Sequence, residues 1–208
     1  MHRGRRGVRS PVAVAAAAVV AAAAGLAAGL LLASGALRPA VPAEGSADVG
    51  FARDMQVHHA QAVEMALLVR ERTDDPELAQ VALDILLTQQ QQQGQMYGWL
   101  AVWGLPQAST APPMAWAAGH AHAGTGDGTM AGMATEEQMA QLRAADGTEA
   151  ERLFLELMIE HHRGGVAMAE AALDRAVRPE VRRLAQAVVD SQTAEIGVLQ
   201  DLLAAVGG

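Results

Sequence analysis

Residues 51–66 read FARDMQVHHAQAVEMA, and residues 154–169 read FLELMIEHHRGGVAMA. Both stretches carry the pattern M-x-x-H-H-x-x-x-x-x-M. The register continues without gaps from Phe51 to Gly104 and from Phe154 to Gly207. Because a paired His motif with its flanking Met residues returns at unchanged spacing, we infer an internal repeat.

Each copy has the pattern of a helical hairpin. Apolar residues recur at helical spacing through residues 51–72, and helix resumes over residues 77–103 after a turn that contains Pro76. The second copy repeats this pattern around Pro179. Proline suits the first turn of a helix because no intrahelical partner is lost there.

Capping signals place two further helix starts. Thr148 is followed by Glu151, and Thr135 by Gln138, so that each pair has the spacing of a capping box. The first pair predicts the start of the second hairpin, and the other predicts a short helix before it. Since two amphipathic hairpins cannot bury their apolar faces alone, the fold class we predict is all-α, a four-helix bundle.

The composition agrees with helices and excludes several classes of function. Apolar residues make up 51% of the 208-residue chain but aromatic residues only 3%, which favours helices over a β-sandwich. There is no Cys, hence no disulfide, thiolate zinc site or iron–sulfur cluster. The formal charge of −8 argues against a nucleic-acid partner.

An apolar run over residues 12–33 follows four Arg residues at the N-terminus. Its 22 residues would span about 33 Å as a helix, which is close to the thickness of a bilayer core. The preceding positive charges predict that the rest of the chain lies outside the cytoplasm. Two interpretations stay open, a single-pass membrane anchor and a signal cleaved near residues 33–36, after which the protein would be secreted. Without the four Arg residues, 11 basic residues remain against 23 acidic ones, a formal charge of −12.

We therefore divide the chain into five parts. They are an N-terminal membrane anchor or signal segment (1–36), a spacer (37–50), the first hairpin repeat (51–104), a flexible crossover rich in Gly, Met and His (105–134), and a short helix with the second hairpin repeat (135–208).

The Met and His residues of each motif share one face of their helix. At 100° per residue they fall within a stripe of about 120°, which we expect to face the bundle interior. Thioether sulfur with imidazole favours a soft cation, Cu(I) before Ag(I), with zinc second and calcium or magnesium poor candidates. The candidate metal ligands are Met55, His58, His59, Met65, Met158, His161, His162 and Met168.

A structural interpretation stands beside the metal-binding one. A Met on an apolar helix face is more often core packing than a ligand, and a lone His is usually structural. The duplication of the joint pattern favours ligation for the set as a whole. In the crossover, Met114, His120, His122, Met130 and Met133 have no evident packing duty, and we weigh soft-metal collection there equally against compositional drift.

Enzyme signatures are mostly missing from the sequence. No Glu is followed by His three residues later, as a di-iron carboxylate bundle requires. The chain also lacks His-Glu-x-x-His, a Walker loop and a Gly-x-Ser-x-Gly elbow. The residues therefore favour a binding protein over an enzyme, and we assign no catalytic residue.

The two motif stretches resemble domain of unknown function family 305, the CopM-like proteins. The resemblance covers residues 48–104 and 132–207, including the stretch GMATEEQMAQLRAADGTEAERLFLELMIEHHRGGVAMAEAAL. It implies an exported, ferritin-like helical bundle, and some members bind copper or silver. The eight Met and His residues named above match the family's proposed ligand positions. Leu199 stands where Met is common, which puts the second site in question.

Two hypotheses of different classes follow. The first is an extracytoplasmic soft-metal protein, most simply for copper as Cu(I), that buffers or hands on the ion and meets the membrane through its N-terminal helix. The second is a metal-free structural or protein-interaction bundle at the membrane surface, with a protein partner or a homo-oligomer as its complex.

Overall fold

The structure is a computed structural model that describes residues 10–33, 40–118 and 130–206. It divides into two compact units, residues 1–41 and residues 42–208. The first unit contains helix α1 (Pro11–Ala33), which is exposed throughout and carries no charged residue. This helix is long and apolar enough to cross a membrane.

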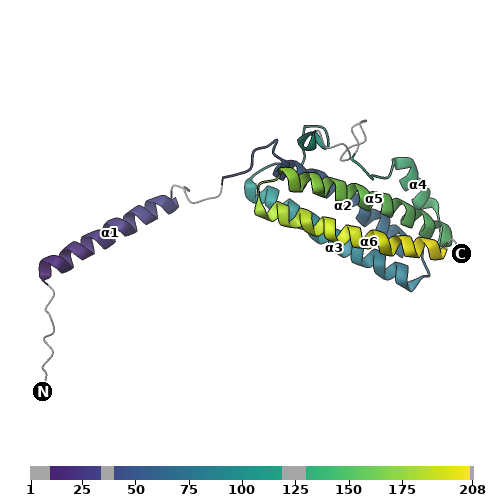
Figure 1. The fold of residues 1–208 in the computed structure, drawn as a ribbon, viewed down its shortest axis with the longest axis horizontal. Helices are drawn as coiled ribbons and strands as arrows, with labels where there is room; N and C mark the ends of the chain where they lie inside the picture. The colour runs from purple at the N-terminus through teal and green to yellow at the C-terminus, as the bar shows by residue number, and fades with distance from the viewer. Residues whose placement is uncertain (1–9, 34–39, 119–129, 207–208) are drawn as a thin grey trace, which may run out of the picture. The chain divides into compact units, whose positions relative to one another are not determined.

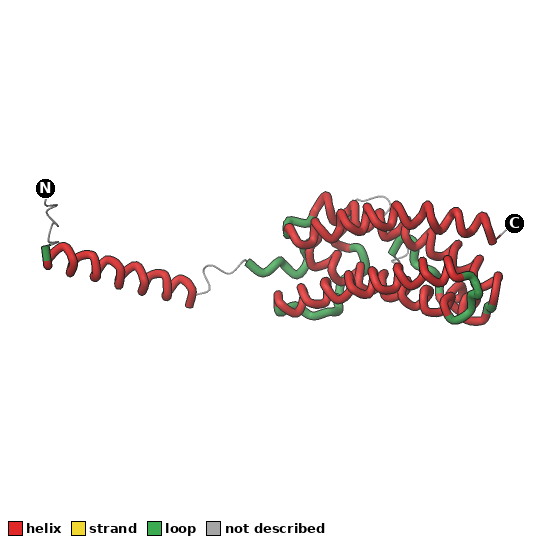
Figure 2. The backbone as a smooth tube through the Cα atoms, turned by 90° about the horizontal axis from the view of Figure 1, so that it is seen from below, coloured by secondary structure: helices red, strands yellow, loops and turns green. Residues whose placement is uncertain are grey.

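The second unit is a bundle of four long helices. These helices are α2 (Ala47–Arg70), α3 (Pro76–Trp103), α5 (Gly147–Arg175) and α6 (Pro179–Val206), and they run side by side (Figure 1). A 3-10 turn η1 (Ala115–Ala117) and a short helix α4 (Glu136–Ala144) lie between the two hairpins in the chain. The described residues contain no strand, and helices joined by loops make up the whole fold (Figure 2). The prediction of an all-α four-helix bundle is confirmed.

Helices α2 and α5 pack against each other in opposite directions. At one end of the bundle the Asp48 carboxylate, at the start of α2, accepts hydrogen bonds from the backbone just after α5. At the other end Thr73 Oγ1, just after α2, donates to Glu151 Oε1 near the start of α5 at 2.6 Å. The two copies of the repeat therefore face each other across the α2–α5 interface.

The helix starts follow the capping chemistry of the sequence in most places. Asp75 accepts from the backbone N–H groups of the first turn of α3, with Pro76 at the first helical position. Thr135 and Gln138 form the predicted capping box of α4. At α5 the prediction is wrong, because the helix begins at Gly147 and its N-cap residue is Asp146 rather than Thr148.

The core consists of two apolar clusters. The first, which we call the proximal cluster, contains Ala47 from the start of α2 and Val181 from the start of α6; the second, the distal cluster, contains Leu78 from the start of α3 and Leu202 from the end of α6. Contrary to expectation, Met114 and Met130 of the crossover are buried in the proximal cluster, and Met133 packs against it. These Met residues have a packing role because the crossover folds back onto the bundle. The other two crossover candidates, His120 and His122, lie outside the described residues.

The buried Asp48 carboxylate supports the turn between α5 and α6. Its oxygens accept from the backbone N–H of Val177 at 3.1 Å and of Arg178 at 2.8 Å. Replacement by Ala leaves both backbone donors without this partner, so Asp48→Ala is expected to lower the free energy of unfolding by about 1–3 kcal/mol. Urea denaturation measures this loss. Asp84→Ala, which removes an exposed carboxylate on α3, should change it by less than about 0.5 kcal/mol, and equal effects of the two changes would contradict the assignment.

Candidate metal centre

Four histidines form the middle of the α2–α5 interface, and we call them the histidine layer. His58 and His59 come from α2, His161 and His162 come from α5, and all four side chains are fully buried. The four Met residues of the two motifs are fully buried as well. The prediction that each stripe faces the bundle interior is confirmed.

Each imidazole uses its Nε2 atom in a hydrogen bond. His58 Nε2–H donates to the carbonyl oxygen of Ala131 at 3.2 Å, and His161 Nε2–H donates to the carbonyl oxygen of His58 at 3.0 Å. A carbonyl oxygen only accepts, so these bonds place the ring proton on Nε2. Nδ1 of both rings therefore carries a lone pair.

The outer histidines are oriented by side chains of the second helix of their own hairpin. His59 Nε2–H donates to Gln92 Oε1 at 2.7 Å, and His162 Nε2–H donates to Glu195 Oε2 at 2.7 Å. All four buried Nδ1 atoms are without a hydrogen-bond partner. A buried lone pair without a donor is costly for a folded protein and is also what a metal ion would bind.

The two inner rings are in contact. The centroids of His58 and His161 lie 3.8 Å apart with an interplanar angle of 33°, whereas the neighbouring rings on one helix lie 6.4 Å apart. His58 and His161 occupy equivalent positions in the two copies. Their contact marks the approximate two-fold axis that relates the hairpins.

Burial keeps the imidazoles of His58, His59 and His161 neutral. Loss of water around the ring lowers the pKa of His58 to about 3 and that of His59 to about 4. The same desolvation, with the neighbouring histidines adding to it, lowers the pKa of His161 well below its usual value. Neutral imidazole is the form that binds metal ions.

The two Met residues of one motif lie on opposite sides of the histidines. Met55 and Met65 are ten residues apart, about 15 Å along a helix, so one ion cannot reach both. Met55 instead lies in the proximal cluster with Met168 of the second copy, and Met65 lies in the distal cluster with Met158. Each pair thus combines one thioether from each hairpin.

The proximal and distal sides of the histidines differ at two positions of the repeat. The sequence shows these differences only once the two copies have been aligned. Met96 lies in the proximal cluster, whereas its counterpart in the repeat, Leu199, lies in the distal cluster. The partner of His59 is the neutral Gln92, and the partner of His162 is the carboxylate Glu195. The run of five Gln residues on α3 contributes this amide from its buried face, where Gln89 and Gln92 lie, while Gln90 and Gln91 are exposed.

A short strap covers the histidines beside α5. The carbonyl oxygen of Ala131 meets His58 on one side, and a side chain at Gly164 would collide with that carbonyl, 2.0 Å from the added Cβ. Gln61 holds the end of the strap at Ala134, donating from Nε2 at 2.9 Å and accepting at Oε1 at 2.7 Å. Residues 131–134 therefore lie directly on the site, where Gly164 permits the close approach.

Within the described part of the chain, no three or more His, Asp or Glu side chains are grouped so that they could hold a metal ion. A site at the histidine layer would therefore need Met sulfur to complete its ligands.

Comparison with known proteins identifies the family. The family model described as Domain of unknown function (DUF305) matches residues 48–203. The chain belongs to the DUF305 family. No functionally curated protein matches this DUF305 chain.

Solved structures of DUF305 proteins share the fold. A protein from Streptomyces coelicolor that is predicted to be secreted is 50% identical, with 80% of this chain and 97% of that chain covered and a TM-score of 0.73. A DUF305 fragment from Deinococcus radiodurans is 38% identical, covering 80% and 98% of the two chains with a TM-score of 0.63. CopM in its Cu(I)-bound form is 25% identical, covering 77% and 98% with a TM-score of 0.60.

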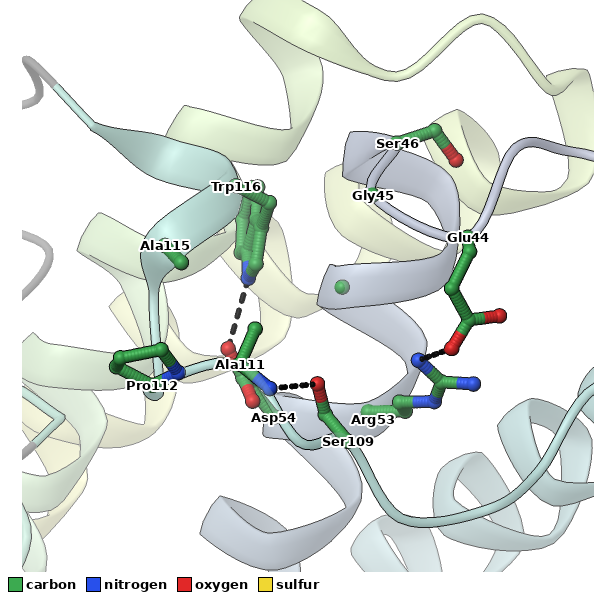
Figure 3. A pocket seen from close by; sticks show the side chains of 11 residues that line it. Glu44, Gly45, Ser46, Arg53, Asp54, Ser109, Ala111, Pro112, Ala115 and Trp116 are labelled. Atoms are coloured by element: carbon green, nitrogen blue, oxygen red, sulfur yellow. Dashed lines mark hydrogen bonds and ion pairs between the residues drawn. The ribbon is translucent and has the colours of Figure 1, made fainter.

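The DUF305 bundle also has a pocket of about 120 Å³ at the start of α2 (Figure 3). Trp116 stands on one side of it, and Asp54 Oδ2 accepts from Trp116 Nε1 and from the backbone N–H of Met114, both at 2.8 Å. Arg53 lines it as well and pairs with Glu44 at 2.6 Å. None of the eight candidate ligands lines this pocket, so it is separate from the histidine layer.

Proposed function

We propose that the protein is an extracytoplasmic soft-metal binding protein that buffers or hands on Cu(I), with Ag(I) as an alternative cargo and zinc second. The observation that carries this proposal is the set of four buried Nδ1 atoms without partners, each on a ring whose Nε2 atom is already engaged. All four rings are oriented by these bonds, and burial keeps His58, His59 and His161 neutral, which is the state in which imidazole binds a metal ion.

The donor set supports a soft cation. The buried groups next to the imidazoles are thioethers, which are soft neutral ligands. Calcium and magnesium need several oxygen ligands, which the described histidine layer does not supply. Glu195 already accepts from His162 Nε2 and serves to orient that ring.

The position of the Met residues supports two sites that both hairpins share. One ion would take Met55 and Met168 on the proximal side of the His58–His161 pair, and the other would take Met65 and Met158 on the distal side. Imidazole Nδ1 atoms would complete both. Because Met96 is found only in the proximal cluster, we expect the proximal site to bind Cu(I) more tightly.

Two further observations support this function. CopM, which has the same fold at 25% identity, was solved with Cu(I) and with Cu(II) bound. The apolar helix α1 and the predicted secretion of the Streptomyces relative support a position outside the cytoplasm, either anchored through α1 or released after cleavage.

Anaerobic titration of residues 42–208 with Cu(I) against a competing chelator tests the proposal. We expect two ions per chain, and one after Met55→Leu with Met168→Leu, since Leu keeps the side-chain volume but removes the sulfur. Met65→Leu with Met158→Leu should remove the other ion. Met139→Leu is the matched control, because Met139 is buried in the distal cluster outside the motifs and both ions should remain.

A metal-free interaction bundle is the alternative, favoured by the hydrogen bond that each His Nε2 already makes. In that case the titration shows no binding above that of the chelator alone, and the soft-metal function is wrong.

A further inference from the structure

Among residues 42–118 and 130–206, the most exposed large apolar side chains lie at the end of the bundle where α2 begins. Val102, near the end of α3, is 86% exposed, and Val177, in the turn between α5 and α6, is 79% exposed. Trp103, which follows Val102, is half-buried, with Arg178 Cζ 5.8 Å from its ring centroid and Trp99 stacked on it at 6.2 Å. We call Val102, Trp103, Val177 and Arg178 the apolar end.

The apolar end is held rigidly. Asp48 accepts from the backbone N–H groups of Val177 and Arg178, so the turn presents the Val177 side chain outward from a supported backbone. Beyond α3, Arg53 donates from Nε to the carbonyl oxygen of Pro106 at 2.9 Å, which holds the segment after Trp103. The exposed Val102 and Val177 side chains therefore belong to segments that hydrogen bonds hold in place.

Positive charge gathers at the same end of an otherwise acidic domain. Residues 174–183 contain four Arg residues and two acidic residues. Arg175 and Arg183 are exposed on either side of the turn. Tryptophan, protruding aliphatic side chains and arginine together are typical of surfaces that contact the interface of a lipid bilayer.

Chain connectivity indicates which partner reaches this surface. Residues 34–46 join α1 to α2, and thirteen residues extend to about 45 Å at most. A bilayer crossed by α1 would therefore always be within reach of the end at which α2 begins. We propose that the apolar end docks on an anionic lipid bilayer, with Val102 and Val177 entering the interface and Arg175 and Arg183 meeting lipid phosphates.

The chain has no Cys, so single labels can report this contact. The full chain is reconstituted in vesicles of phosphatidylcholine with about 30 mol % phosphatidylglycerol, after Val102→Cys or Val177→Cys and coupling to an environment-sensitive dye. We expect a blue shift and quenching by headgroup-depth spin-labelled lipid at both positions. Leu87→Cys and Val198→Cys, exposed sites in the middle of α3 and towards the end of α6, are the controls and should stay unquenched.

A charge variant tests the lipid phosphates. Arg175→Gln with Arg183→Gln should lower the quenching at residue 177 to the level of the controls, whereas Arg152→Gln with Arg163→Gln, an equal change of charge elsewhere on α5, should leave it unchanged. Equal quenching at all four labelled positions overturns the proposal, as does none at residues 102 and 177. A blue shift that depends on protein concentration without lipid also overturns it, and assigns the surface to a second copy. The Cu(I) titration is independent of each of these outcomes.

Discussion

Cu(I) or Ag(I) is expected to raise the melting temperature of residues 42–208 by about 8–16 °C. A ligand present at about a thousand times its Kd stabilises the folded state by about 4 kcal/mol. In a domain of this size each kcal/mol shifts Tm by about 2–4 °C. Differential scanning calorimetry with and without the metal ion measures the shift.

His58→Ala with His161→Ala should abolish this shift, because the Nδ1 atoms of both inner rings are lost as metal ligands. The double variant will also melt at a lower temperature without metal, since it leaves a cavity where two rings were packed. The quantity to compare is therefore the difference between the two melting temperatures of each protein. Gln89→Leu with Gln192→Leu, which changes two buried polar residues outside the donor set, should retain the shift. No shift in the unmutated domain would rule out the function.

Acidification is expected to unfold the metal-free domain between about pH 6.5 and pH 4. Three histidines have pKa values that burial lowers in the folded state, to about 3 for His58, to about 4 for His59 and well below the usual value for His161. In this window the unfolded chain binds more protons than the folded one, so the free energy of unfolding falls as the pH falls. Each histidine contributes about 1.4 kcal/mol per pH unit, and three of them about 4 kcal/mol per unit, which is comparable to the whole stability of many domains.

Urea denaturation at a series of pH values measures this effect through the denaturation midpoint. His58→Leu with His161→Leu should flatten the pH dependence, because two of the titrating groups are gone. Asp84→Ala is the control for a surface change and should leave the slope as it was. A midpoint that stays constant from pH 7 to pH 4.5 would contradict the burial of neutral imidazoles. Bound Ag(I) should move the loss of stability to lower pH, since protons and metal compete for Nδ1.

The internal repeat and its helical periodicity predict the fold because the turn residues and the apolar pattern indicate the same two hairpins. Pro76 and Pro179 divide the hairpins where the structure does, and the buried faces of α2 and α5 follow the His and Met spacing. That Met55 and Met168 lie in the same cluster could not be predicted, because it depends on how α2 and α5 pack against each other. The same tertiary register decides that Gln92 and Glu195 orient the outer histidines.

In the crossover, the local sequence does not predict the burial of the Met residues. Met114 and Met130 stand in a segment rich in Gly and Pro that has no helical period, so their burial in the proximal cluster has no local signal. Asp146 likewise replaces Thr148 as the N-cap of α5 although Thr148 has a Glu three residues later. For the two Met residues, packing against distant parts of the chain outweighs the local preference.

The sharing of each Met pair between the hairpins has a consequence for the order of events after export. Neither hairpin alone holds both thioethers of a site, because Met55 and Met168 come from opposite halves of the chain. Under the proposed ligation, a chain still emerging from the membrane cannot capture its cargo, and loading waits until the C-terminal half has docked. The ion would then be bound only by fully folded molecules, in which it would link the two hairpins.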